Sequence, residues 1–316
     1  MRFTIFTPAY NRAHTLGRLF ESLKKQSFQD FEWLVVDDGS TDNTEALVQS
    51  FISQKPFFEI RYIKTENGGK HRAINRGMPY AKGELTFLLD SDDWLTDNSL
   101  YLIDQAEKSI PLEVRNEFIG VSGLKITKDE NIIGKTFTGE YVDASYMQRT
   151  KYGICGDKGE VYYTELLKKY PFPEFEGEKF ATERLVWNKM SFDGYKIRYF
   201  NKPVQYCEYL DDGLTAGGYS MYAKYPKQWG LAIWQDYHYG EKGFKGWYHN
   251  TMQVYVFYLY MKKNLPLKEI AKCLKTTGFR LRFEVFIQSF MDCIRWIVKR
   301  GGTMKRSAKQ EMKKHK

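Results

Sequence analysis

Short apolar runs and helically spaced apolar residues alternate along the first hundred residues of the chain. The runs are long enough for buried strands and occupy residues 2–6, 32–38, 58–65 and 84–90. Between the first two runs, apolar side chains recur with the spacing of one helix face, at Leu16, Leu19, Phe20 and Leu23. Strands that alternate with helices connect by right-handed crossovers. The pattern therefore predicts an α/β fold with a mostly parallel sheet flanked by helices.

The alternation weakens after residue 110 and changes again near residue 220. We expect strands at residues 118–126, 132–137 and 196–200, and a helix at residues 181–193. Farther on, six apolar residues form one helical stripe: Phe279, Phe283, Phe286, Phe290, Ile294 and Ile297. We therefore predict a domain at residues 1–215, with halves at 1–100 and 101–215, and a helical C-terminal extension at 216–316.

Composition and cysteine use restrict the class of protein. Hydrophobic residues make up 42% and aromatic residues 16% of the chain, which is typical of a globular protein and excludes a disordered one. No uncharged apolar window of about 18 residues occurs, so we expect no spanning helix, and no signal segment precedes the first apolar run. The four cysteines are scattered without a zinc-type spacing, which favours reduced core residues of a cytoplasmic protein.

The positive charge is concentrated in the tail. The last 18 residues hold eight Lys and Arg and one Glu, a net +7 that leaves only +2 of the total +9 for the rest of the chain. A basic tail behind a nearly neutral body fits a solvated end or an anionic membrane surface, and we expect no nucleic-acid partner. The predicted location is the cytoplasm, with peripheral attachment to the inner face of the membrane through the C-terminal helices and tail.

Polar residues follow the ends of all four predicted strands. In an open α/β sheet, ligands bind beyond the carboxyl ends of the strands. Residues 7–12, 37–38, 66–72 and 90–93 all stand at such ends, so we expect their side chains to converge on one rim.

Three carboxylates follow the fourth strand within four residues. Asp90, Asp92 and Asp93 have no Lys or Arg in the five positions after them. Such a cluster suits Mg²⁺ or Mn²⁺, which takes one or two carboxylates and completes its shell with water and phosphate oxygens. The alternative is that one aspartate caps a helix near residues 97–105, which explains one acid and not three.

The other loops each allow two interpretations. Asp42 and Glu45 have capping-box spacing, so residues 35–44 are explained as a turn and a helix start. Residues 67–77 are either a glycine turn with a basic helix start, or a phosphate site made by Lys70 and the helix amino end. Tyr10 either packs in the core or offers a flat surface to a base.

Taken together, four segments resemble a known family. TPAYNR, VVDDGSTDNT, NGGKHRAINRG and LLDSDDW, in this order, are similar to the nucleotide-sugar-binding half of the family 2 inverting glycosyltransferases, which have the GT-A fold. The resemblance covers residues 1–100 and extends more weakly over residues 172–190. It implies that residues 1–215 form a GT-A domain, with a nucleotide-sugar half (1–100) and an acceptor half (101–215).

The resemblance also implies roles for single residues. Asp90 and Asp92 match the family's Asp-x-Asp motif and would hold Mn²⁺ or Mg²⁺. The residues expected to bind the nucleotide-sugar donor are Thr7, Pro8, Tyr10, Arg12, Asp38, Asn67, Gly69, Lys70, Arg72, Asp90 and Ser91. One departure is Ile74, where many relatives carry an arginine, and Lys70 or Arg72 is expected to take over its phosphate contact.

A second departure concerns the catalytic base. Where family members often carry Glu-Asp at a helix start, this chain has Glu183 followed by Arg184. We expect Glu183 to be the base, with Glu178 and Glu176 as the next candidates, or else Glu183 only caps its helix. Asp211 and Asp212, in a glycine-rich segment, are expected near the acceptor.

The sequence thus predicts a metal-dependent inverting glycosyltransferase. It would move a sugar from a nucleoside-diphosphate donor, a UDP-sugar, to a hydroxyl of a glycan or lipid-linked acceptor. One alternative is a nucleotidyltransferase, which would be expected to open with a glycine-rich loop, whereas this chain has no glycine before Gly17. The other is a non-catalytic protein that binds nucleotides or nucleic acid.

Overall fold

The structure is a computed structural model that describes residues 1–208, 224–239, 268–269 and 272. The chain divides into two compact units, residues 1–218 and 219–316. In the first unit, one mixed sheet is built from β1 (Phe3–Ala9), β2 (Phe31–Asp37), β3 (Glu59–Lys64), β4 (Leu85–Leu88), β5 (Trp94–Leu95), β6 (Phe118–Ile126), β7 (Tyr141–Ala144), β8 (Lys158–Tyr163) and β9 (Lys196–Tyr206). Its helices are α1 (Leu16–Lys24), α2 (Thr44–Ser53), α3 (Lys70–Gly77), α4 (Ser99–Lys108), α5 (Thr164–Leu167) and α6 (Arg184–Phe192), with short 3-10 turns at Met78–Tyr80, Leu112–Glu117 and Arg149–Tyr152.

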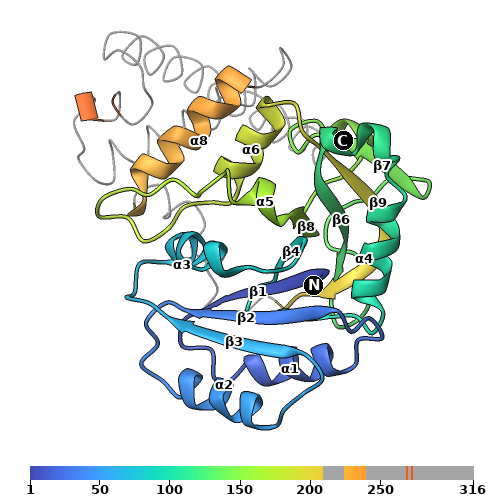
Figure 1. Ribbon diagram of the computed structural model, residues 1–316. Coiled ribbons are helices and arrows are strands. Elements are labelled where there is room, and N and C mark those ends of the chain that lie inside the picture. The colour runs from blue at the N-terminus through green and yellow to red at the C-terminus, as the bar shows by residue number, and fades with distance from the viewer. Residues whose placement is uncertain (209–223, 240–267, 270–271, 273–316) are drawn as a thin grey trace, which may run out of the picture. The chain divides into compact units, whose positions relative to one another are not determined.

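The strand order is β3-β2-β1-β4-β8-β6-β9-β5, and β7 pairs with β9. The first four strands in this order are parallel, β8 runs antiparallel to both its neighbours, and β6 and β9 are parallel again. The α/β fold with helices on both faces of the sheet, predicted from the alternating pattern, is confirmed (Figure 1).

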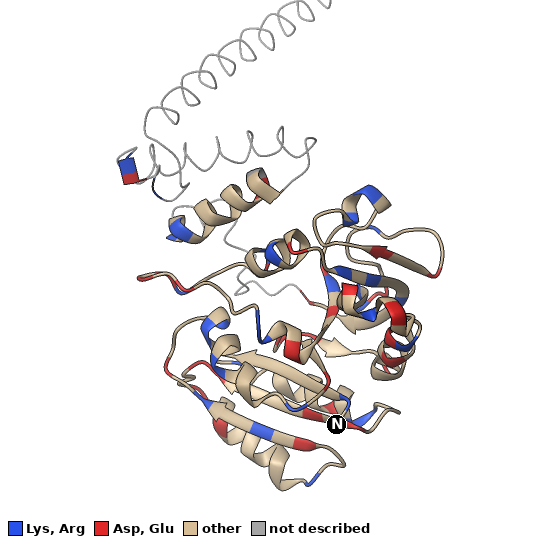
Figure 2. Ribbon diagram, turned by 45° about the horizontal axis from the view of Figure 1, so that its top comes forward, with Lys and Arg blue, Asp and Glu red and all other residues tan. Residues whose placement is uncertain are grey.

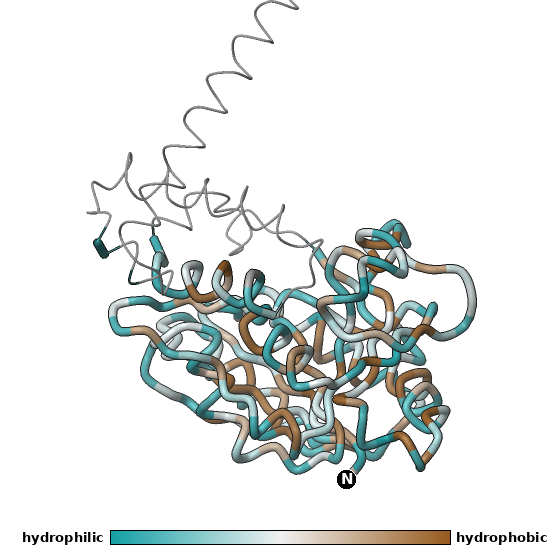
Figure 3. The backbone as a smooth tube through the Cα atoms, turned by 90° about the horizontal axis from the view of Figure 1, so that it is seen from above, coloured by the Kyte–Doolittle hydropathy of each residue, from teal (hydrophilic) through white to brown (hydrophobic). Residues whose placement is uncertain are grey.

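Both faces of the sheet are buried, which explains why the strands are continuous apolar runs. On one face, α1, α2 and α4 pack on alternate strand residues, and Trp33 stacks on the rings of Phe20 and Phe51. On the other face, α3, α5 and α6 cover residues such as Leu34 and Val36. Figure 3 shows the apolar stretches inside the first unit and the hydrophilic ones mainly in its outer loops. Burying each such side chain contributes about 1.5–3 kcal/mol, so the sheet is a rigid base for its loops.

Three local predictions were wrong. Residues 132–137 are not a strand: they form only isolated bridges, at Ile132 and Lys135, because Gly134 turns the backbone with a φ of 78°. The sequence did not reveal β7 and β8. The capping box of Asp42 and Glu45 does not form, because α2 begins at Thr44 and Asp42 instead accepts a bond from the Thr44 N–H at 3.0 Å. The helix near residues 181–193 does form, and Leu185 and Met190 are buried as expected.

In the second unit, the structure describes α8 (Pro226–Tyr239). The predicted Phe/Ile stripe at residues 279–297 and the basic tail lie outside the described residues. In the described part of the chain, no helix is both long and apolar enough to cross a membrane. The predicted division of the chain at residues 100 and 215 stays a prediction.

Candidate active site

The loops that follow the parallel strands meet at one edge of the sheet. Backbone bonds continue past the strand ends, from the Asp38 N–H to the Ala9 carbonyl at 2.8 Å and from the Leu89 N–H to the Phe6 carbonyl at 2.9 Å. The loops at residues 10–15, 38–44, 65–70 and 89–93 therefore form a shared rim. Acidic and basic residues are interspersed over the first unit, and several of both kinds lie in these loops (Figure 2).

The first two loops are tied together through Asn11. This residue has a φ of 54°, its N–H donates to the Ser40 hydroxyl at 2.8 Å, and its side-chain oxygen accepts from the Thr41 N–H at 2.9 Å. The turn leaves the Tyr10 side chain 46% exposed beside it. Tyr10 is therefore presented as a flat surface at the rim and is not part of the core.

Thr7 and Pro8, expected to bind the donor, lie below this surface. Both are buried in β1, and the Thr7 hydroxyl accepts a bond from the Trp33 indole N–H at 3.0 Å. Their side chains do not reach the rim in this structure. Arg12 lies in the rim loop itself, where its N–H donates to the Thr44 hydroxyl at 2.9 Å.

Asp38 occupies the amino end of α3. Its two carboxylate oxygens accept bonds from the Gly68 N–H at 2.8 Å and the Gly69 N–H at 2.7 Å. Burial raises the pKa of Asp38, although these two N–H groups act in the opposite direction. The protein thus places its own carboxylate where a helix amino end would otherwise receive an anion. A donor phosphate at this end of α3 is left with Lys70 as its partner.

The glycine loop is also fixed from the other half of the first unit. The Asn67 side chain donates to the Asp38 carbonyl at 2.9 Å and accepts from Lys179 Nζ at 2.7 Å. Gly69 has a φ of 98°, and a Cβ added there would lie 2.0 Å from the Lys179 carbonyl oxygen. Only glycine fits this close approach, so Asn67 and Gly69 join residues 67–69 to the segment before α6.

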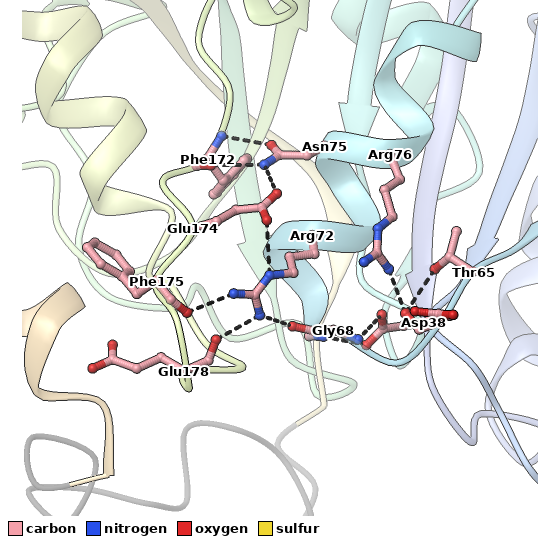
Figure 4. A network of polar contacts seen from close by, with 12 residues as sticks. Asp38, Thr65, Gly68, Arg72, Asn75, Arg76, Phe172, Glu174, Phe175 and Glu178 are labelled. Carbon is pink, nitrogen blue, oxygen red and sulfur yellow. Dashed lines mark hydrogen bonds and ion pairs between the residues drawn. The ribbon is translucent and has the colours of Figure 1, made fainter.

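Two residues of α3 hold residues 172–178 against it (Figure 4). Arg72 donates to the Gly68, Phe175 and Glu178 carbonyls at 2.7–2.8 Å and to the Glu174 carboxylate at 3.1 Å. We call this set the Arg72 clamp. It is an unexpected role for Arg72, because the clamp already uses four of the five guanidinium N–H groups.

Asn75 completes the attachment of this segment. Its side chain accepts from the Phe172 N–H at 2.8 Å and donates to the Phe172 carbonyl at 2.9 Å (Figure 4). Ile74, the departure noted in the sequence, is 1% exposed and packs in the core. An arginine at this position would therefore place a charge in an apolar site.

The three carboxylates after β4 have different partners. Asp90 pairs with Lys70 at 2.5 Å, and Asp93 pairs with Lys125 at 3.3 Å. Within the described ranges, Asp92 has no ion-pair partner. Two of the like charges are therefore neutralised by lysines that lie far away in the sequence. Neither Asp90 nor Asp92 caps α4, whose start shows no side-chain cap.

The environment also separates the pKa values of these acids. Burial raises the pKa of Asp90, but Lys70 and Lys125 outweigh it, so the net shift is downward. Burial and the neighbouring charge of Asp90 raise the pKa of Asp92. Burial raises the pKa of Asp93 to about 6, although Lys125 opposes it. Asp93 is 3% exposed and also accepts from the Gln205 side chain, so it anchors the loop.

Sequence reasoning missed the residues that support this loop. Lys125 was detectable, because it interrupts the otherwise apolar strand β6. Arg18 was not: from α1 it donates to the Asp92 carbonyl at 2.7 Å and lies 3.7 Å over the Trp94 ring. Arg18 thus holds the backbone of the acidic loop. Ser91, expected to bind the donor, is 7% exposed.

Lys70 connects the acidic loop to Glu183. Its ammonium lies 2.5 Å from Asp90 Oδ1 and 2.6 Å from Glu183 Oε1. Burial disfavours the charged ammonium, but the two carboxylates outweigh it and raise the pKa of Lys70 well above its ordinary value. Glu183 precedes α6 and makes no side-chain cap bond there. The alternative that Glu183 only caps its helix is therefore not what the structure shows.

A second acidic group lies near this bridge. Glu160 on β8 pairs with Arg149 at 3.4 Å, and the Glu183 and Lys125 charges act on it. Burial raises the pKa of Glu160 to about 7, although Arg149 opposes it. Strand β8 therefore holds a carboxyl group with a pKa near neutral pH, which the sequence did not suggest.

Two groups of predicted residues remain without structural support. Asp211 and Asp212 lie outside the described residues. In the described ranges, no group of three or more His, Cys, Asp and Glu side chains is arranged to hold a metal ion by itself. Asp92 and Asp90 nevertheless fit Mg²⁺ or Mn²⁺ in type and number, because these ions bind through one or two carboxylates when phosphate oxygens supply further ligands.

Glycosyltransferases are similar to this chain in sequence. The family model described as Glycosyl transferase family 2 matches residues 4–108. The chain is 26% identical over 235 residues to the GalNAc(5)-diNAcBac-PP-undecaprenol beta-1,3-glucosyltransferase of Campylobacter jejuni. The aligned region covers 71% of this chain and 72% of that protein.

Solved structures show the same fold. TarS 1–349 of Staphylococcus aureus, in complex with UDP-GlcNAc, has a TM-score of 0.59 at 20% identity and covers 83% of this chain and 73% of that one. The mannosyltransferase PcManGT of Pyrobaculum calidifontis, in complex with GDP-Man and Mn²⁺, has a TM-score of 0.54 at 17% identity and covers 92% and 84%. Glu183 and the Arg72 clamp partners at residues 174–178 lie beyond the family match, which ends at residue 108.

Proposed function

Because this chain belongs to glycosyl transferase family 2 and is a glycosyltransferase, we propose that it performs metal-dependent, inverting transfer from a UDP-sugar to a hydroxyl of a lipid-linked glycan. One observation carries the proposal. The Lys70 ammonium lies within 2.6 Å of both Asp90, which follows β4, and Glu183, which precedes α6. Asp90, on the proposed donor side, and Glu183, on the proposed acceptor side, therefore contact the same ammonium, although 93 positions separate them in sequence.

The donor side is assigned from the rim. Tyr10, 46% exposed, would stack on the base, and Asp38 with Asn67 and Gly69 would form the wall that the nucleoside contacts. Lys70 would contact the diphosphate, because Asp38 already fills the helix amino end and Arg72 is engaged in its clamp. Arg12, in the same rim loop, is proposed as a second cation beside it.

The metal side is assigned to Asp92 and Asp90. Asp92 is the carboxylate of the loop without an ion-pair partner in the described ranges, and Arg18 holds its backbone carbonyl at 2.7 Å. A bound Mn²⁺ or Mg²⁺ would supply stabilisation of the charge that develops on the leaving diphosphate. The solved structure of PcManGT, which holds GDP-Man and Mn²⁺, supports the use of a divalent metal.

Glu183 is proposed as the general base. Inversion needs a carboxylate that takes the proton of the acceptor hydroxyl on the face opposite the leaving diphosphate. The Glu183 side chain is 34% exposed, so an acceptor can reach it, and Lys70 holds one of its oxygens. The other oxygen can then receive the proton.

The acceptor is proposed from a relative, and the location from the charge of the tail. The Campylobacter relative is named for an undecaprenol-linked glycan, which supports a lipid-linked acceptor. Eight basic residues among the last 18 would attract the chain to an anionic membrane, so we propose peripheral attachment at the cytoplasmic face.

A donor-hydrolysis screen tests the function most broadly. The full chain is incubated with UDP-, GDP- and other nucleotide sugars, with Mn²⁺, with Mg²⁺ or with chelator, and release of the nucleotide is measured. The proposal expects hydrolysis of a UDP-sugar that chelation abolishes. Activity that is equal with chelator would contradict the metal dependence, and release from GDP-sugars alone would contradict the choice of UDP. A thermal shift with UDP plus Mn²⁺, compared with single-stranded RNA, separates this function from nucleic-acid binding.

A further inference from the structure

The ion-pair bridge of Lys70 has a consequence for how the site is loaded. Its ammonium has three N–H donors, and the pairs with Asp90 at 2.5 Å and Glu183 at 2.6 Å use two of them. Lys70 is the first residue of α3, and its side chain is 28% exposed. The side chain is therefore partly exposed, and it can leave its two partners without unfolding the helix.

The Lys70 ammonium and a bound divalent ion would compete for Asp90. The Asp90 oxygen that Lys70 contacts belongs to the loop that also carries Asp92, the carboxylate left for a metal ion. A divalent ion bound by both acids would stand next to the ammonium, and like charges at that distance repel strongly. Both cations cannot hold Asp90 in the same geometry.

From this competition, and resting on the proposed function, we propose that Lys70 gates the site. It holds Asp90 and Glu183 together, releases Asp90 to a divalent cation that arrives with the diphosphate, and then contacts the diphosphate itself. Lys70 is thus a positioning residue that couples occupation of the donor side to the freedom of Glu183. The contacts around the acidic loop favour this movement. Arg18 and the ion pair of Asp93 with Lys125 hold the loop in place while Lys70 moves.

The gate predicts that removing the Lys70 ammonium changes the affinities for Mn²⁺ and for UDP in opposite directions. A purely structural ion pair does not predict this. Removing the ammonium frees Asp90, so binding of Mn²⁺ without nucleotide should become tighter. Removing the same ammonium takes away a phosphate partner, so binding of UDP with Mn²⁺ present should become weaker. A lysine that only stabilises the fold would leave both affinities unchanged or weaken both.

The experiment is titration calorimetry on the full chain with MnCl₂ alone and then with UDP at saturating Mn²⁺. Lys70→Met and Lys70→Gln are compared with wild type and with Lys82→Met, a control lysine that pairs with Glu59 at 2.9 Å on the surface. Both Lys70 variants should bind Mn²⁺ about five- to tenfold more tightly without nucleotide. Loss of a positive charge a few ångströms from the metal should raise its affinity by about that factor or more. Their UDP affinity should fall by about tenfold or more.

Several results would overturn the gate. Mn²⁺ affinity that is unchanged or weaker in both Lys70 variants, measured on folded protein, contradicts it. So does an absence of Mn²⁺ binding in both variants before nucleotide is added. Failure of the proposed function has a different signature: UDP would bind wild type equally well with Mn²⁺ and with chelator.

Discussion

At the residue scale, three aspartates of one motif have three different roles. Asp93 is buried and anchors the loop, Asp90 pairs with Lys70, and Asp92 is our proposed metal ligand. The order and spacing of these acids were readable from the sequence. Their separation was not, because it depends on Lys70 and Lys125, whose approach is set by the packing of α3 and β6.

The role of Asp92 can be tested by a change that keeps its shape. Asp92→Asn removes one charge from the metal site, so UDP binding should lose its dependence on Mn²⁺ or Mg²⁺ and become about tenfold weaker or more with metal present. Calorimetry with and without chelator measures this, and Asp97→Asn, an exposed neighbour, serves as the control. Wild-type affinity of the variant in Mn²⁺ would show that Asp92 is not a ligand.

Glu160 predicts how stability varies with pH. Its pKa is raised from 4.5 to about 7 in the folded chain, so the folded state binds the extra proton between these values. That contribution is fully present below pH 4.5 and is lost as the pH rises through about 7. Between pH 5 and pH 8, the unfolding free energy of wild type should fall by roughly 1–3 kcal/mol more than that of Glu160→Gln. Denaturant titrations at both pH values measure it, and parallel profiles would argue against a raised pKa.

At the scale of elements, the segment before α6 is attached to α3 by backbone contacts. Arg72 and Asn75 donate hydrogen bonds to main-chain carbonyls of this segment, and Gly69 closely approaches the Lys179 carbonyl. Such contacts leave little trace in sequence, because every residue carries the same main-chain atoms. The missed strands have a similar reason: β8 begins with Lys158, a buried ammonium that donates to backbone carbonyls, and its polarity conceals the strand.

Gly69 allows this attachment to be tested with a matched control. Gly69 has a φ of 98° and Gly194 a φ of 96°, but an added Cβ meets the Lys179 oxygen at 2.0 Å only at Gly69, and nothing within 4 Å at Gly194. Gly194→Ala should cost about 1 kcal/mol of unfolding free energy, from backbone strain. Gly69→Ala should cost about 2–4 kcal/mol and weaken UDP binding as well. Equal costs in chemical denaturation would show that the segment does not lie against the glycine loop.

At the scale of the whole molecule, the fold followed from the alternation of apolar patterns, because parallel crossovers leave few arrangements of such elements. The order of strands beyond β4 did not, since β8, β6 and β9 are joined by long segments whose pairing depends on distant partners. The C-terminal helical stripe and tail stay predictions, because they lie outside the described residues.

The tail has its own test at this scale. If the basic end attracts the chain to anionic lipid, full-length protein should float with anionic liposomes and much less with neutral ones, with salt reducing recovery. A version that ends at Lys299 should lose most of this difference, because residues 300–316 carry +6 of the total charge. Equal recovery with both lipids would exclude the electrostatic part of the attachment.

The central claim is that donor and acceptor chemistry meet at Glu183. Glu183→Gln keeps the size of the side chain but cannot accept a proton, and Glu165→Gln, at an exposed glutamate that pairs with Lys168 at 2.8 Å, provides a control. The decisive measurement is the rate of sugar transfer by the full chain, alongside its UDP affinity in Mn²⁺. The account predicts that transfer by Glu183→Gln falls on the order of a hundredfold or more while UDP affinity stays within about twofold. Near-normal transfer by this variant would contradict the account and move the base elsewhere.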